Sequence, residues 1–159
     1  MKKKPTIYIE TSIISYLAAR PSPDLMTVAC QQITTRWWEG SRRFYKVVTS
    51  ALVVAESREG DPQMAKKRLD LLRGISALRT TEEAKELARA LTQKGALPHK
   101  AQADALHIAI AAAHGVDYLL TWNCRHIDNP ATKPLVREVC LSEGYACPEI
   151  CTPFEIMEL

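Results

Sequence analysis

Long apolar segments are missing from this sequence. The longest apolar run, at 108–113, is far shorter than the roughly 20 residues that a membrane span needs. The amino-terminal residues MKKK are basic, but Pro5 and Glu10 interrupt the chain beyond them, so no apolar stretch typical of a signal peptide is present. We therefore expect a cytoplasmic protein with no membrane segment.

Closely spaced cysteine pairs are missing too. The five cysteines form an odd set, and no two of them show the tight C-x₂-C spacing of a zinc knuckle. His126, Cys140, Cys147 and Cys151 are suitable zinc ligands by type but not by spacing. The pattern predicts reduced thiols rather than a disulfide framework or a structural zinc site.

What the sequence does contain is typical of a globular protein. A length of 159 residues suits about one domain, and the hydrophobic share of 47% and charged share of 25% match soluble proteins. The net charge of +3 is uneven, because residues 121–159 carry three basic and six acidic side chains, which leaves +6 for residues 1–120. This asymmetry suits a polyanionic partner on one side, or a solvated surface with scattered charge.

Short apolar, β-branched segments alternate with helical patterns along the chain. The expected strands are 6–9, 44–49, 76–79, 118–120 and 147–151, and the expected helices are 12–17, 24–38, 51–58, 61–74, 80–95, 100–114 and 133–143. Alternating strands and helices indicate βαβ units. We predict that residues 1–159 form a single α/β domain, with a central, mostly parallel sheet flanked by helices on both faces.

Glu10 directly follows the first expected strand, and ligands of parallel α/β sheets bind outside the carboxyl ends of the strands. The simpler alternative is that Glu10 only caps the next helix. Asn123 follows the strand 118–120 and would lie at the same edge. Asp117 begins that strand, and at about 3.3 Å per residue it would lie roughly 20 Å from Asn123, so we expect a structural role for it.

Two further acids fall on apolar helical stripes. Glu56 lies three and four residues after Val53 and Leu52, so it either faces the core with a partner or sits at the solvated edge of the stripe. Asp104 shares a stripe with small and apolar residues and needs a partner, which a cation shared with Glu10 would supply. His107 lies one turn on and either orients Asp104 or is a hydrogen-bonded core histidine, the reading we favour.

Four blocks in a fixed order carry a resemblance: IETS at 9–12, AE at 55–56, ADALHIA at 103–109 and LTWNCRHI at 120–127. The chain resembles the PIN domain over nearly its whole length, and is most similar to the VapC-type toxins of bacterial and archaeal toxin–antitoxin pairs. The resemblance implies a metal-dependent endoribonuclease that uses Mg²⁺ or Mn²⁺ to hydrolyse RNA.

The resemblance also implies the site residues. Glu10, Glu56, Asp104 and Asn123 match the acidic positions of the family, with Ser12 and Thr121 beside them as polar substrate-binding residues. Two positions depart from the family pattern: Glu10 replaces the usual Asp, and Asn123 replaces a frequent Asp. The loss of a charge at Asn123 weakens the case for a second ion, for which Asp128 is a possible substitute ligand.

Roles follow from the chemistry of divalent ions, which prefer hard oxygen ligands. Glu10 and Asp104 are expected to hold the first ion, and Glu56 is either a further ligand or the group that holds the attacking water. Asn123 would bind metal through water or position the phosphate. We expect one ion in the free protein, with the second arriving with RNA.

Arg125 and His126 are the candidates for holding the RNA backbone. The family resemblance implies two further partners, a small antitoxin protein and a second copy of the chain in a homodimer. Trp37, Trp38 and Phe44 are either interface residues or core residues.

The sequence leaves one alternative function open and argues against another. The Glu10 and Asn123 departures leave open a catalytically weak PIN fold that only binds RNA or an antitoxin. A phosphatase of the aspartyl-phosphate kind needs an Asp-x-Asp pair after the first strand, which IETS lacks.

Overall fold

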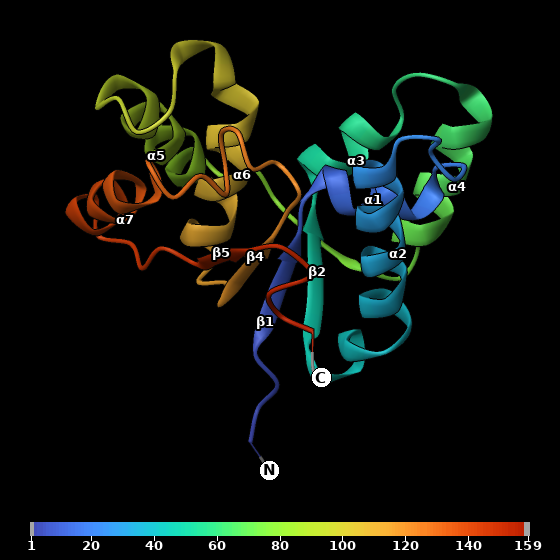
Figure 1. The fold of residues 1–159 in the computed structure, drawn as a ribbon. Helices are drawn as coiled ribbons and strands as arrows, with labels where there is room; N and C mark the ends of the chain where they lie inside the picture. Colours follow the sequence, from blue (N-terminus) through green and yellow to red (C-terminus); the bar gives the residue numbers. More distant parts are fainter. Residues whose placement is uncertain (1, 158–159) are drawn as a thin grey trace.

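Five short strands form one parallel sheet in the computed structural model, which describes residues 2–157 (Figure 1). The strand order is β3-β2-β1-β4-β5. The strands are β1 (Thr6–Ile9), β2 (Lys46–Ser50), β3 (Ser76–Leu78), β4 (Tyr118–Leu120) and β5 (Glu149–Cys151). The chain runs outward from β1 to β3 and then returns to the other side of β1, so the strand order reverses between β1 and β4. In open α/β sheets such a switch point is where ligands bind.

Seven α-helices cover the two faces of the sheet (Figure 1). One face carries α1 (Thr11–Ala18), α2 (Leu25–Glu39), α3 (Ala51–Ser57) and α4 (Pro62–Leu72), and the other carries α5 (Glu82–Gln93), α6 (Gln102–Ala113) and α7 (Lys133–Ser142). Short 3₁₀ helices lie at Ser41–Phe44 and His99–Ala101. The predicted fold class is confirmed, with a sheet that is parallel throughout. No helix within residues 2–157 is long and apolar enough to span a membrane.

Local signals set most helix starts as expected. The side chains of Asp24, Ser50 and Asp61 accept hydrogen bonds from the first turns of α2, α3 and α4. The side chain of Glu10 caps α1, and that of Thr81 caps α5.

One of the errors in element boundaries lies before β2. The predicted strand 44–49 begins too early, because Ser41–Phe44 closes a 3₁₀ turn and Tyr45 precedes the strand, which starts at Lys46. The register explains the start of pairing: Thr6 opposes Lys46, and the Lys46 amide donates to the Pro5 carbonyl at 2.9 Å.

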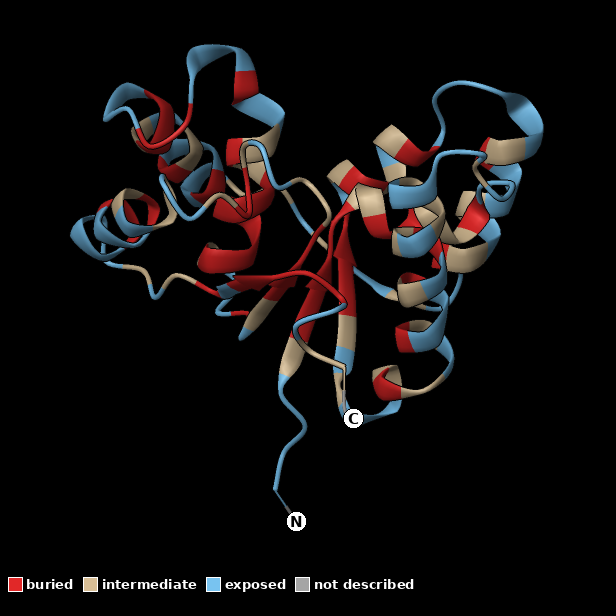
Figure 2. Ribbon diagram, in the orientation of Figure 1, coloured by how far each residue is buried: buried red, intermediate tan, exposed pale blue. Residues whose placement is uncertain are grey.

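The core lies on both faces of the sheet. Ile7, Tyr8 and Ile9 are all fully buried, which is why β1 is apolar at successive positions rather than alternating. Figure 2 shows β1 and β2 buried toward their carboxyl ends and more exposed at their amino ends. Trp37 is fully buried in the core, while Phe44 is 40% exposed, so the alternative core reading holds for Trp37. All five cysteines are free thiols.

Candidate active site at the carboxyl edge of the sheet

The first predicted acid lies at the switch point. Glu10 follows β1, and its backbone amide donates to the Leu120 carbonyl at the end of β4, at 3.0 Å. Because β1 and β4 are parallel neighbours, the residues after both strands meet at this edge. The prediction that Glu10 and the segment after β4 share one edge is confirmed.

Glu10 is held almost entirely by hydrogen bonds. Its Oε2 accepts from the Ser12 amide at 3.1 Å, from Ser12 Oγ at 2.5 Å and from Thr121 Oγ1 at 2.8 Å. The helix-cap reading is therefore correct for this oxygen. Oε1 lies 4.0 Å from His107 Nε2 and accepts no hydrogen bond from residues 2–157. A carboxylate that is only 6% exposed thus keeps one oxygen without a donor.

Glu56 is anchored to α6 through His107. Its Oε1 accepts from Thr11 Oγ1 at 2.6 Å and lies 2.7 Å from His107 Nε2. Burial raises the pKa of the Glu56 carboxyl, but the hydrogen bonds from the His107 ring and the Thr11 hydroxyl lower it further, so its pKa falls below the ordinary value. Glu56 is therefore a half-buried, ionised carboxylate with partners, rather than a solvated residue.

A buried relay supports this contact. His107 Nδ1 lies 2.7 Å from the Tyr8 hydroxyl, which lies 2.8 Å from Ser50 Oγ, and that oxygen accepts from the Val53 amide at 3.1 Å. Since the Val53 amide only donates, every group has a partner if Ser50 donates to Tyr8, Tyr8 to Nδ1, and Nε2–H to Glu56. Burial raises the pKa of the Tyr8 phenol well above its ordinary value, so it stays protonated.

Asp104 is bound by His126. Its Oδ2 lies 2.9 Å from His126 Nδ1, and within residues 2–157 no hydrogen bond joins it to His107. The favoured core reading of His107 is confirmed, because the ring is 1% exposed and bonded at both nitrogens. Nothing in the sequence marked His126 as the partner, since the pair is 22 residues apart with the rest of α6 and β4 between them.

Asn123 ties the loop after β4 to these acids. Its amide donates to Thr121 Oγ1 at 2.9 Å, and its Oδ1 accepts from the His126 amide at 3.0 Å. A continuous hydrogen-bond path therefore runs from Glu10 through Thr121, Asn123 and His126 to Asp104. The structure brings Glu10, Asn123 and Asp104 into one network, which Glu56 approaches only through His107, 4.0 Å from Glu10. The catalytic roles of these residues stay predictions.

The donor set suits a hard cation, although the ligands do not form a finished site. Glu10 Oε1, Glu56 Oε2 and Asp104 Oδ1 each accept no hydrogen bond within the described residues, which leaves one oxygen of each acid for an ion. Between Lys2 and Met157, however, no three His, Cys, Asp or Glu side chains are grouped closely enough to hold a metal. The donor type fits Mg²⁺ or Mn²⁺, and the three acids would have to come closer together to hold one ion.

Other predicted residues fall at varying distances from this network. Ser12 and Thr121 hold Glu10, and Ser12 Oγ also accepts from the Trp122 amide at 2.9 Å.

Arg125 is exposed, with no ion pair in the described part of the chain. Asp128 makes a part-buried ion pair with Lys133 at 2.5 Å, which compensates its charge, and its role as a substitute ligand stays a prediction. Asp117 accepts from the Thr6 amide and hydroxyl at the opposite edge, which confirms its structural role.

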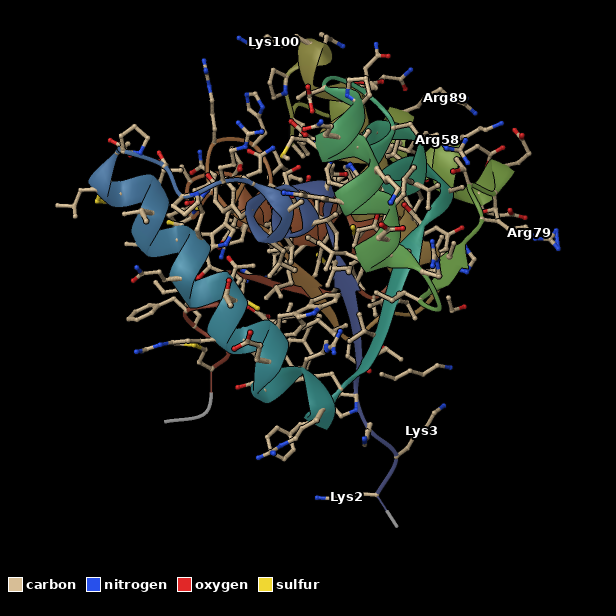
Figure 3. The ribbon with its side chains drawn as sticks, turned by 90° about the vertical axis from the view of Figure 1, so that its right-hand side faces the viewer. Lys2, Lys3, Arg58, Arg79, Arg89 and Lys100 are labelled. Carbon is tan, nitrogen blue, oxygen red and sulfur yellow. The ribbon has the colours of Figure 1, made fainter. Side chains whose placement is uncertain are left out.

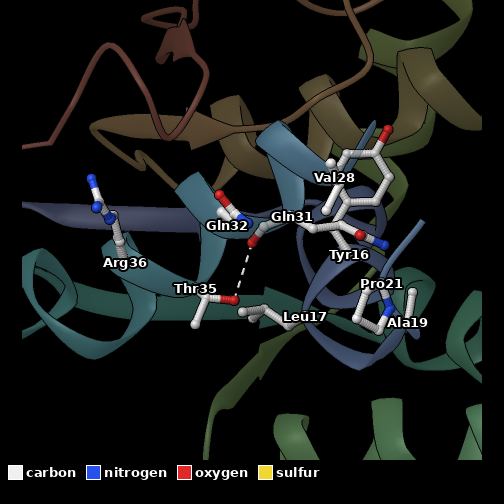
Figure 4. Close-up of a pocket in the computed structure, with 9 residues that line it drawn as sticks. All are labelled: Tyr16, Leu17, Ala19, Pro21, Val28, Gln31, Gln32, Thr35 and Arg36. Atoms are coloured by element: carbon white, nitrogen blue, oxygen red, sulfur yellow. Dashed lines mark hydrogen bonds between the residues drawn. The ribbon is translucent and has the colours of Figure 1, made fainter. Parts of the chain in front are cut away.

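A hollow of about 410 Å³ opens between α1 and α2, outside this network (Figure 4). Tyr16, Leu17 and Val28 supply apolar lining, and Gln31, Gln32 and Arg36 supply polar groups. Leu25 and Met26, at the start of α2, are 79% and 74% exposed. Exposed apolar side chains beside a hollow are typical of a protein-binding surface.

Comparison with known proteins identifies the fold. No family model matches the chain, and no curated protein matches it. The crystal structure of VapBC2 from Rickettsia felis bound to a fragment of promoter DNA is similar, with a TM-score of 0.58 and 15% identity. The match covers 92% of this chain and 98% of that one. The chain has a VapC-like PIN fold. At this identity the likeness establishes the fold alone. This is the fold that the four sequence blocks predicted.

Proposed function

We propose that this protein is a metal-dependent endoribonuclease and the toxin of a toxin–antitoxin pair. One observation supports this most strongly: Glu10 after β1, Glu56 on α3 and Asp104 on α6 each take part in hydrogen bonds at the switch point of a VapC-like PIN fold, and His107 of α6 lies 2.7 Å from Glu56 and 4.0 Å from Glu10. Carboxylates drawn in from solvent are costly to the fold unless they are paired or bind a cation. None of Glu10, Glu56 and Asp104 is paired with a lysine or arginine within residues 2–157.

Glu10, Asp104 and Glu56 would hold Mg²⁺ or Mn²⁺, with Asn123 assisting through water or by positioning the phosphate. A divalent ion supplies an activated water and neutralises the charge that develops on the phosphate. The protein groups around the acids then hold them in place. Thr121 and Ser12 fix Glu10, His107 keeps Glu56 ionised, and His126 orients Asp104.

The exposed Arg125 would contact the RNA backbone beside the acids, as predicted from the sequence. Besides contacting the RNA backbone, His126 would act as a hydrogen-bond acceptor. Its Nδ1 faces Asp104, and its Nε2 makes no hydrogen bond within the described residues. A neutral ring in that orientation presents an acceptor to a ribose hydroxyl or a metal-bound water.

An antitoxin is the proposed protein partner. The similar structure is a VapBC2 complex, and the hollow between α1 and α2 offers this chain an apolar surface for such a partner. We expect Val28→Asp to abolish antitoxin binding without loss of RNA cleavage. We also propose a homodimer, which light scattering tests; a monomer at high concentration would refute it.

The open arrangement of the ligands favours one alternative, a PIN fold that binds RNA or an antitoxin without cutting. In the described chain no three ligands are grouped for an ion, and Asn123 supplies no charge. One result separates the two functions: the nuclease cleaves RNA in the presence of Mn²⁺, and the binding protein does not.

Cleavage of a labelled single-stranded RNA tests the proposal. We expect cleavage in Mn²⁺, none in excess chelator, and a loss of at least about a hundredfold in Asp104→Asn, since a metal contributes several kcal/mol to the transition state. Asp117→Asn is the matched control, because it makes the same chemical change at the opposite edge. Wild-type protein that binds RNA but never cleaves it would establish the binding alternative.

A further inference from the structure

Cations gather at the amino edge of the sheet, opposite the candidate active site. We define the basic edge as Lys2, Lys3, Lys4, Arg42, Arg43 and Lys46. The register brings its two segments together: Thr6 opposes Lys46, and Lys4 Nζ donates to the Arg43 carbonyl at 2.7 Å. Figure 3 shows Lys2 and Lys3 extending from the lower end of the molecule, far from Lys100 at the other end.

The charges of the basic edge are not compensated by ion pairs. None of its six side chains forms a salt bridge with any residue from Lys2 to Met157. Two carboxylates lie nearby. Glu39 lines a hollow of about 400 Å³ that Lys4, Arg42 and Arg43 also line, and Asp117 accepts hydrogen bonds from Thr6. Six cations against two acids leave a strongly positive surface, which costs stability through self-repulsion unless an anion binds.

Aromatic rings lie among these cations. The Arg42 guanidinium is 4.0 Å from the centroid of the Trp38 ring, and that of Arg43 is 4.8 Å from the centroid of Phe44. Phe44 is 40% exposed, and Trp38 and Tyr45 line the hollow beside it. Planar guanidinium groups stacked on rings, next to flexible lysines, form a surface with both π-faces and positive charge.

We propose that the basic edge binds unstructured single-stranded RNA at a second site outside the candidate active site. This inference rests on the proposed function and deepens it by naming the substrate class. Phosphates would pair with the free cations, and unstacked bases would stack on the exposed ring of Phe44. A duplex would use the charges but not the ring. An anionic membrane would need a larger exposed apolar area than the ring of Phe44 supplies, so single strands are favoured.

The second site would select long RNA. Lys4 and Glu10 are six residues apart along β1, or roughly 20 Å at about 3.3 Å per residue. A strand held at the basic edge therefore has to continue along the molecule to reach the acids. A short oligonucleotide can occupy only one of the two sites.

Binding is best measured by fluorescence anisotropy in the Asp104→Asn background, so that the RNA stays intact. The probe is an unstructured RNA of about 16 nucleotides, the upper range for one single-strand-binding domain. Arg43→Ala/Lys46→Ala should lower the slope of log K against log salt by about 1.4, because each lost phosphate contact removes about 0.7. Lys66→Ala/Lys67→Ala, which removes the same charge from the exposed face of α4, is the matched control and should change nothing.

Phe44 separates stacking from charge. Phe44→Leu should weaken binding about tenfold, while Phe44→Trp should restore it, since base stacking needs an aromatic face. Thermal unfolding of each variant shows whether the fold is retained. Equal effects of Leu and Trp, or a control pair as weak as the basic-edge pair, would overturn the proposal. So would tighter binding to phosphatidylserine vesicles, or to a duplex of equal length, than to the single strand.

The same data distinguish this inference from the proposed function. If the basic-edge variants lose RNA affinity while wild-type protein never cleaves RNA, the second site stands and the nuclease does not. If the protein cleaves RNA but all basic-edge variants bind it like wild type, the nuclease stands and the second site is refuted.

Discussion

The two edges of the sheet handle charge in opposite ways. At the carboxyl edge, three acids are drawn inward and each is held by hydroxyls or a histidine, so that Glu10 is only 6% exposed. At the amino edge, six cations point outward with no ion pair among residues 2–157. Parallel strands make the two ends inequivalent, because every strand ends at one edge and begins at the other. Acids that are fixed in position suit the proposed hydrolysis of one phosphodiester bond. Exposed cations suit the proposed binding of RNA, whose sequence varies.

The cost of order also differs between the edges. Holding Glu56 requires the buried relay of His107, Tyr8 and Ser50, in which each donor needs a partner. At the basic edge few side chains have to be fixed in position, since its lysines and Arg43 stay exposed. Substitutions at the carboxyl edge should therefore affect both activity and stability, and those of the basic-edge residues should affect binding alone.

Glu10→Gln at the carboxyl edge and Glu39→Gln at the amino edge test whether only the carboxyl edge supports cleavage. An amide oxygen can still accept from Ser12 and Thr121, so the cap survives, but the charge that we propose holds the ion is lost. We expect kcat for RNA cleavage to fall at least about a hundredfold, because a metal contributes several kcal/mol to the transition state. Glu39→Gln at the amino edge should leave kcat unchanged. Similar kcat values for the two variants would break the comparison.

Tyr8→Phe tests the buried relay. It leaves His107 Nδ1 and the Ser50 hydroxyl without their partner, and we expect a loss of about 1–3 kcal/mol in the free energy of unfolding, measured with urea. Tyr118→Phe in β4 is the control, because the Tyr118 hydroxyl makes no hydrogen bond with the described residues. It should change stability by less than about 0.5 kcal/mol. Equal losses would show that the relay adds nothing.

The pH dependence of stability should report an acid at each edge. Contacts lower the folded pKa of Glu56, chiefly through His107, and that of Asp117, through the Thr6 amide and hydroxyl. A depressed folded pKa gives stability that is present above the unfolded value, near 4.3 for Glu and 3.9 for Asp, and lost as the pH falls through the folded value. We therefore expect the stability of wild type to fall between about pH 5 and the acid limit.

Single substitutions assign this slope. Glu56→Gln and Asp117→Asn should each flatten part of it, as measured by urea unfolding across that range. A wild-type stability that rises on acidification, or that neither variant changes, would contradict the assignment.

Asn123→Asp has the smallest expected effect. It adds a carboxylate beside His126 and Thr121, where a hard cation would prefer charge to an amide. We expect a second, weak Mn²⁺ site to strengthen, with the fold unchanged. An Mn²⁺ affinity equal to that of wild type would show that Asn123 lies outside the metal site.

The sequence predicted the sheet, its helices and the meeting of Glu10 with Asn123, because strand composition, cap residues and parallel topology are encoded locally. It did not predict the partners of the acids. His126 reaches Asp104 across a loop whose path depends on packing, and Thr11 reaches Glu56 from another element. The error at 44–49 has the same origin, since Phe44 has strand propensity but closes a 3₁₀ turn in which the Arg43 guanidinium lies 4.8 Å from the centroid of its ring.

Calorimetric titration of the free protein with Mn²⁺ tests the central claim, that the acids of the carboxyl edge hold a divalent ion. We predict one site in the wild type, lost in both Glu10→Gln and Asp104→Asn and retained in Asp117→Asn. The −3 charge from three carboxylates offsets one divalent ion fully but two only in part, so a second ion should bind only with RNA. No binding, binding that survives both substitutions, or two tight and equivalent sites without RNA would contradict this claim.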